Sequence, residues 1–142
     1  MNNLSTSKWK EYRDYTVDRI VKSTVDWNPY WHVLIENTFH PELFSFIKTE
    51  WPDFENCNYR KNVKGFNQNR KIYNPNQPDG LPFWYDFYNN IINHKEIIDA
   101  VYTLEDLQNN CCGTTSSVWE DYQGYSVSTV SYTHLRAHET WS

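Results

Sequence analysis

Several features that this sequence lacks exclude whole classes of protein. No apolar run approaches the roughly 20 residues that a membrane-spanning helix needs. The first residues, Met1–Thr6, do not show the basic and then apolar pattern of a secretory signal. No internal repeat or low-complexity tract is present. We therefore predict a cytoplasmic protein without a membrane segment.

Cysteine and basic charge are also scarce. Cys57, Cys111 and Cys112 are an odd number and form no paired CxxC motif, so they predict neither a zinc site nor a disulfide framework. Lys and Arg total 13 against 18 Asp and Glu, which gives a formal net charge of −5. This acidic balance argues against a nucleic-acid partner, because nucleic-acid binding depends on clustered Lys and Arg.

The last residues of the chain resemble translated adapter DNA. Val130–Thr140 can be back-translated, codon by codon, into the adapter that transposase-based library preparation joins to DNA fragments. We therefore expect residues 130–142 to be an artefactual tail, and residues 1–129 to be the N-terminal part of a single domain. His134 and His138 have the four-residue spacing of a zinc-binding helix, but on this interpretation they carry no function.

Hydrophobic spacing and punctuation residues predict a helical N-terminal half. Pro41 suits a first helical turn, and Glu42 after it favours the helix dipole. His40 and His94 each stand directly before a predicted helix; we interpret His40 as a surface or capping residue and His94 as a cap or a hinge. The predicted helices are Ser7–Thr24, a helix from Pro41 that Pro52 ends, Leu81–Asn93 and Lys95–Leu107.

Runs of aromatic and β-branched residues predict strands, so the predicted fold class is α+β. The segment from Asp53 to Gly80 is expected to be a long irregular connection with one short strand. Its basic residues are interpreted as a solvated face, with contact to an anionic substrate as the alternative; they are Arg60, Lys61, Lys64, Arg70 and Lys71. The predicted strands are Tyr30–Ile35, Lys71–Tyr73, Val118–Tyr122 and Gly124–Thr129.

Two stretches resemble the prolyl-hydroxylase-like group of iron(II)/2-oxoglutarate-dependent oxygenases. Trp31–Leu43, followed later by Glu50-Trp51-Pro52, resembles the N-terminal strand and helix of that family. Gly124–Thr129 resembles the residues that lead directly into the family's His-x-Asp metal motif. The resemblance implies the N-terminal helices and first strands of a truncated double-stranded β-helix, or jelly-roll, domain.

The resemblance also implies what the complete parent protein would do. The parent would bind Fe(II) and 2-oxoglutarate and hydroxylate an unactivated C–H bond of a small-molecule or protein substrate. Its metal histidine would stand where Val130 now stands, so we expect this chain to be inactive, with no catalytic or metal residue and no bound cofactor. Because side chains alternate along a strand, Ser126 and Ser128 would share the ligand face, and we expect them at the pocket wall.

A non-enzymatic interaction module is the alternative hypothesis. Aromatic residues make up 18% of the chain, including seven Trp and eleven Tyr. Exposed rings such as Trp31, Trp84 or Trp119 could stack on carbohydrate, because an indole presents a flat apolar face. A downstream His-x-Asp followed by a distant His would favour the oxygenase over this module. Substrate identity and oligomeric state stay open in both hypotheses.

Overall fold

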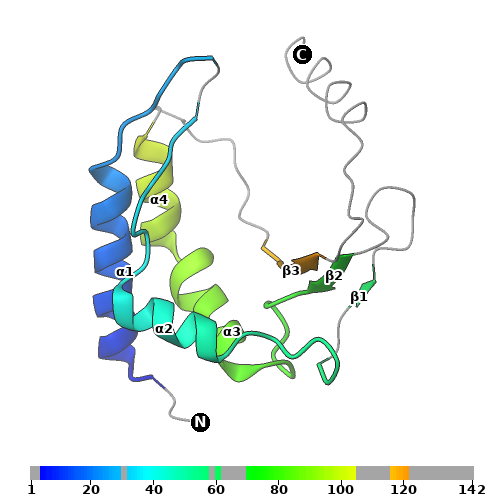
Figure 1. The fold of residues 1–142 in the computed structure, drawn as a ribbon. Helices are drawn as coiled ribbons and strands as arrows, with labels where there is room; N and C mark the ends of the chain where they lie inside the picture. The colour runs from blue at the N-terminus through cyan, green and yellow to red at the C-terminus, as the bar shows by residue number, and fades with distance from the viewer. Residues whose placement is uncertain (1–3, 30–31, 58–59, 62–69, 105–115, 122–142) are drawn as a thin grey trace.

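The computed structural model describes residues 4–29, 32–57, 60–61, 70–104 and 116–121. The helices gather on one side of the molecule and the strands on the other, with the sheet beside α3 (Figure 1). The α+β class is therefore confirmed. The elements in chain order are α1 (Thr6–Val21), α2 (Pro41–Thr49), β1 (Arg60–Lys61), β2 (Arg70–Tyr73), α3 (Pro82–Phe87), the π-helix η1 (Tyr88–Ile92), α4 (Lys95–Thr103) and β3 (Val118–Asp121).

Helix α1 lies along the helical side and buries one face. Ser5 caps it, because the Ser5 side chain accepts a hydrogen bond from the Lys8 backbone N–H at 3.3 Å. Thr16 is buried, and its hydroxyl donates a hydrogen bond to the Tyr12 carbonyl at 3.1 Å. The buried residues recur every three or four positions, as one helix face requires, and they are Trp9, Tyr12, Thr16 and Ile20.

Both predicted histidine caps are confirmed. The Nδ1 atom of His40 accepts a hydrogen bond from the Glu42 backbone N–H at 3.2 Å, at the start of α2. The Nδ1 atom of His94 accepts in the same way from the Glu96 N–H at 3.3 Å, at the start of α4. Each cap satisfies one of the backbone donors that a helix leaves unpaired in its first turn.

Arg13 joins three helical segments. Its Nε donates to the Glu96 carboxylate of α4 at 2.7 Å, and its Nη1 donates to the Asn90 carbonyl of η1 at 3.3 Å. The Arg13 side chain is only 11% exposed. The hydrogen bond from Arg13 lowers the pKa of Glu96 below its ordinary value. A charged group this far from solvent requires such partners, and they hold α1 against η1 and α4.

The sheet is antiparallel, with strand order β1-β2-β3. Directly opposed residues share a face, and Tyr73 opposes Val118 while Ile72 opposes Trp119. Tyr73 and Val118 are buried in the main core with residues of the helices. The helices therefore cover the Tyr73–Val118 face, and Trp119 projects from the other one. The predictions at 71–73 and 118–121 are confirmed, whereas the short strand β1 was not predicted.

The strand predicted at Tyr30–Ile35 is wrong over the part that the structure describes. His32 makes a single bridge to Asp26, with backbone N–O distances of 2.8 and 2.9 Å, and no strand follows through Ile35. Leu34 is 80% exposed. Aromatic and β-branched residues favour a strand only where a neighbouring strand receives them, and among the described residues this segment makes only the isolated bridge to Asp26.

Helix limits also differ from those predicted. Helix α2 ends at Thr49, with Glu50 as its C-cap, before Pro52 can act. The helix predicted over Leu81–Asn93 begins at Pro82 and changes to a π-helix at Tyr88. The strand predicted at 124–129 lies outside the described residues. Among the described residues, no helix combines the length and apolar character needed to cross a membrane.

We expect Arg13→Met to lower the free energy of unfolding by about 1–2 kcal/mol, because it removes a charge-assisted hydrogen bond and leaves the Asn90 carbonyl without this donor. Urea denaturation followed by circular dichroism measures the change. Lys10→Met is the matched control, since the Lys10–Asp14 pair is exposed and should contribute less than about 0.5 kcal/mol. Equal losses in the two variants would contradict the role given to Arg13.

Candidate functional site

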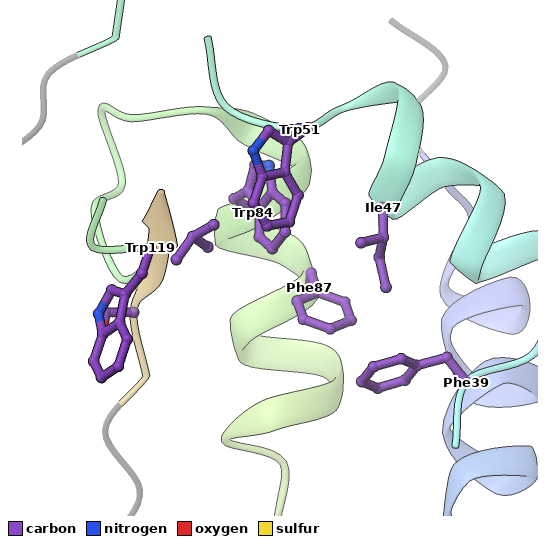
Figure 2. Close-up of a pocket in the computed structure, with 8 residues that line it drawn as sticks. Phe39, Ile47, Trp51, Trp84, Phe87 and Trp119 are labelled. Atoms are coloured by element: carbon purple, nitrogen blue, oxygen red, sulfur yellow. The ribbon is translucent and has the colours of Figure 1, made fainter. Parts of the chain in front are cut away.

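A cavity of about 330 Å³ lies between the helical side and strand β3 (Figure 2). Its helix-side residues come from α2, α3 and the segments that flank α2. Its strand-side residues come from the start of β3. The residues that line it are Phe39, Ile47, Trp51, Trp84, Phe87, Ser117, Val118 and Trp119.

Interlocked rings fix the helix side of the cavity. Trp84 is 4% exposed, and its indole Nε1 donates a hydrogen bond to the Glu50 carbonyl at the end of α2. Its ring meets Trp51 edge-on at 5.8 Å and Phe87 edge-on at 5.7 Å, the geometry that aromatic quadrupoles favour. Phe39 meets Phe87 in the same way at 5.5 Å. These contacts hold the wall in a single arrangement.

Trp119 forms the strand side and carries a cation on its ring. The guanidinium carbon of Arg70 lies 3.7 Å from the Trp119 ring centroid, within the range of a cation–π interaction. Arg70 is 7% exposed, whereas Trp119 is 50% exposed. Lys71 forms an ion pair with Glu55. The expectation that Arg70 and Lys71 belong to a solvated charged face is therefore wrong, because one stacks on an indole and the other pairs with a carboxylate.

The chemistry of this cavity is that of binding rather than of proton transfer. None of its lining side chains is an acid or a base, and Ser117 supplies the one hydroxyl. Within the described ranges, no group of three or more His, Cys, Asp and Glu side chains could hold a metal ion. The described residues therefore do not fit an iron centre. An apolar, ring-lined cavity favours a flat apolar group.

A second cavity, of about 220 Å³, is smaller and more polar than the first. Its lining residues are Asn56, Cys57, Tyr73, Gln77, Asp79, Gly80 and Leu81. The Tyr73 hydroxyl accepts a hydrogen bond from the Leu81 N–H at 2.7 Å, and burial raises the pKa of Tyr73. Burial also raises the pKa of the Cys57 thiol, which keeps it protonated and a poor nucleophile. A Cβ atom at position 80 would lie 2.5 Å from the Tyr73 hydroxyl oxygen, so any other residue there would force the hydroxyl or the turn to shift.

The predicted site residues have mixed outcomes. Ser126 and Ser128, expected at the pocket wall, lie outside the described residues, as does Trp31. Trp84 was expected to be exposed and is instead buried, because its ring packs against Trp51 and its indole N–H donates to the Glu50 carbonyl at the end of α2. Trp119 is half exposed, as the stacking hypothesis requires. The cavity itself was not predicted.

No protein-family model, no curated protein and no solved structure matches this chain. A functional hypothesis therefore depends on the geometry above and on the sequence resemblance. The geometry contributes an aromatic cavity and a sheet that is covered by helices on one face. The resemblance contributes the order of segments and the residues that follow β3.

We expect Gly80→Ala to lower the free energy of unfolding by about 1–3 kcal/mol, because the new methyl group would overlap the Tyr73 hydroxyl and displace its hydrogen bond to Leu81. Thermal and urea unfolding measure the loss. Asp79→Ala, at the exposed neighbouring position, is the control and should change stability by less than about 0.5 kcal/mol. An unchanged Gly80→Ala protein would show that the turn can move away from Tyr73.

Proposed function

We propose that residues 1–129 are the N-terminal part of an iron(II)/2-oxoglutarate-dependent oxygenase with a jelly-roll core, and that residues 130–142 are foreign to it. The observation that carries the proposal is an antiparallel sheet covered on one face by N-terminal helices, whose last described strand, β3, precedes Gly124–Thr129 by two residues. That segment resembles the approach to the family's His-x-Asp motif.

The burial of the sheet supports a site on its other face. Tyr73 is 1% exposed and Val118 8% exposed, so the helices cover the sheet face at both of these positions. Ile72 and Trp119, which oppose one another across β2 and β3, lie on the face turned away from the helices. A ligand bound to this sheet would therefore meet the Trp119 side, where an indole ring is half exposed.

The described residues have supporting roles in this proposal. When bound in the parent, Fe(II) and 2-oxoglutarate supply the oxidising chemistry, and their ligands would come from positions outside the described residues. Tyr73 and Val118 fix the sheet to the helices, and Trp84 and Phe87 fill the layer between them. Ser126 and Ser128, which lie outside the described residues, remain proposed pocket-wall residues on the strand predicted at 124–129. The substrate is a small molecule or a protein.

The present chain should show no 2-oxoglutarate turnover when iron and ascorbate are supplied, because the residues expected to hold the iron are missing from it. Succinate release measures turnover. The coding DNA recovered from the source should encode His-x-Asp directly after codon 129 and a further His later. The protein completed with this sequence should release succinate from 2-oxoglutarate.

Two results would contradict the oxygenase. Turnover by the 142-residue chain would show that the metal ligands lie elsewhere. Source DNA that encodes the same residues as Val130–Thr140 would remove both the foreign tail and the expected position of the metal motif. The completed protein with the His-x-Asp histidine changed to Ala serves as the control, and it should release no succinate.

A second candidate is favoured by one observation, the half-exposed indoles at the rim of the apolar cavity. Trp51 is 46% exposed and Trp119 is 50% exposed, and both line the cavity. Rings in such positions can stack on the apolar face of a sugar. This arrangement supports the non-enzymatic carbohydrate-binding module as the alternative.

Binding of cellohexaose tests this alternative by tryptophan fluorescence. If the module binds it, Trp119→Ala should weaken binding about tenfold, because one stacked ring contributes on the order of 1 kcal/mol beyond its buried area. Trp27→Ala is the matched control, because Trp27 is 67% exposed and does not line the cavity. Equal effects of the two substitutions, or no spectral change with the unmodified chain, would exclude the alternative for this glycan.

A further inference from the structure

Helices α2 and α4 begin with the same arrangement of residues. In each, a histidine caps the helix and a glutamate follows two residues later: His40 and Glu42 in α2, His94 and Glu96 in α4. Each histidine accepts the glutamate N–H through Nδ1. An imidazole can accept only through an unprotonated nitrogen, so protonation of Nδ1 abolishes the cap and brings a positive charge to the positive end of the helix dipole.

Each glutamate is also held by a cation of α1. Lys8 contacts the Glu42 carboxylate at 3.0 Å, and Arg13 contacts that of Glu96 at 2.7 Å. Two interactions therefore stabilise the start of each helix. The histidine accepts a hydrogen bond from the helix backbone, and a cation of α1 pairs with the glutamate in the first turn. Loss of the histidine cap weakens the attachment of the helix to α1 without removing the ion pair.

The charges around the two histidines differ. His40 lies between the rings of Tyr12 and Tyr15, each 5.3 Å away, and its Nε2 is 4.0 Å from the Glu11 carboxylate.

At His94 the principal neighbours from the packed elements are Arg13 of α1, which repels a proton, and Glu96 of α4, 4.0 Å from Nδ1, which attracts one. The π-helix η1 carries no charged side chain, and Lys95 is paired with Asp99. Burial and the neighbouring Arg13 charge therefore disfavour a proton on His94.

We propose that His94 is an acid-sensitive latch: a proton on its imidazole uncaps α4 and loosens that helix from α1, while α2, whose Leu43 and Ile47 are buried in the main core, stays packed. The residues that would separate are Ile97 and Ala100 of α4, which pack against Ile20 of α1 in a small cluster of their own. This cluster is separate from the main core, so α4 can loosen without exposing Trp84 or Phe87.

The pH range follows from the direction of the pKa shift. Burial, and then the charge of Arg13, lower the pKa of His94 in the folded chain. The unfolded chain therefore binds the proton more readily than the folded chain does. A fall in pH thus favours the state in which α4 is released from α1. The stabilisation that His94 contributes is complete above the ordinary histidine pKa of about 6.5 and is lost as the pH falls through the lower folded value.

Nuclear magnetic resonance of the whole 142-residue chain between pH 7.5 and 4.5 tests the latch. The Glu96 backbone amide, the donor to His94, should shift with a midpoint below 6.5, and the hydrogen-exchange protection of the α4 amides should fall about fivefold across the same midpoint. The α2 amides should lose less protection than the α4 amides. Protection factors are compared because they remove the intrinsic pH dependence of exchange.

Two variants separate this latch from a general effect of acid. His94→Asn keeps a capping side chain that does not titrate, so α4 should stay protected at pH 4.5. His94→Ala removes the cap, so α4 protection should already be low at pH 7.5. His40→Asn is the matched control and should leave the α4 response unchanged. An acid response that survives in His94→Asn, or α4 protection that does not change with pH in the unmodified chain, would overturn the proposal.

Discussion

The helical half of this molecule depends on one nearly buried cation. The Arg13 guanidinium of α1 must find partners because a charge out of water is costly, and it finds them on η1 and α4. The Asn90 carbonyl and the Glu96 carboxylate come from different segments, so the single side chain fixes their relative positions. Once α4 and η1 are placed against α1, α3 is placed as well, because it runs directly into η1, and its Trp84 and Phe87 share the main core with Tyr73 and Val118 of the sheet.

Aromatic packing then connects the helices to the strands. Trp84 and Phe87 are buried between α2 and β3, and the Trp84 indole is tied to the Glu50 carbonyl. Rings are large and rigid, so they fill the space beside a narrow strand incompletely. The cavity lined by Val118 and Trp119 occupies the space that is left. Both candidate functions use this region, one through the outer face of the sheet and the other through the cavity rim.

The sequence was informative where local physics decides the structure and uninformative where contacts between distant residues decide it. Pro41 and the histidine caps predicted the starts of α2 and α4, because capping depends on neighbouring residues. The strand predicted at 30–35 was wrong over 32–35, since none of the described strands pairs with it. The cavity and the stack of Arg70 on Trp119 join residues far apart along the chain, so no local pattern could reveal them.

The π-helix has a consequence for the phase of the helices on either side of it. A π-turn accommodates about one residue more than an α-turn, and each residue of an α-helix advances by about 100°. Were Tyr88–Ile92 wound as an ordinary α-helix, Trp84 and Phe87 would point about a quarter turn away from their present direction relative to the residues after Ile91. The wider turn thus lets one continuous helical stretch present rings to the sheet and aliphatic side chains to α1.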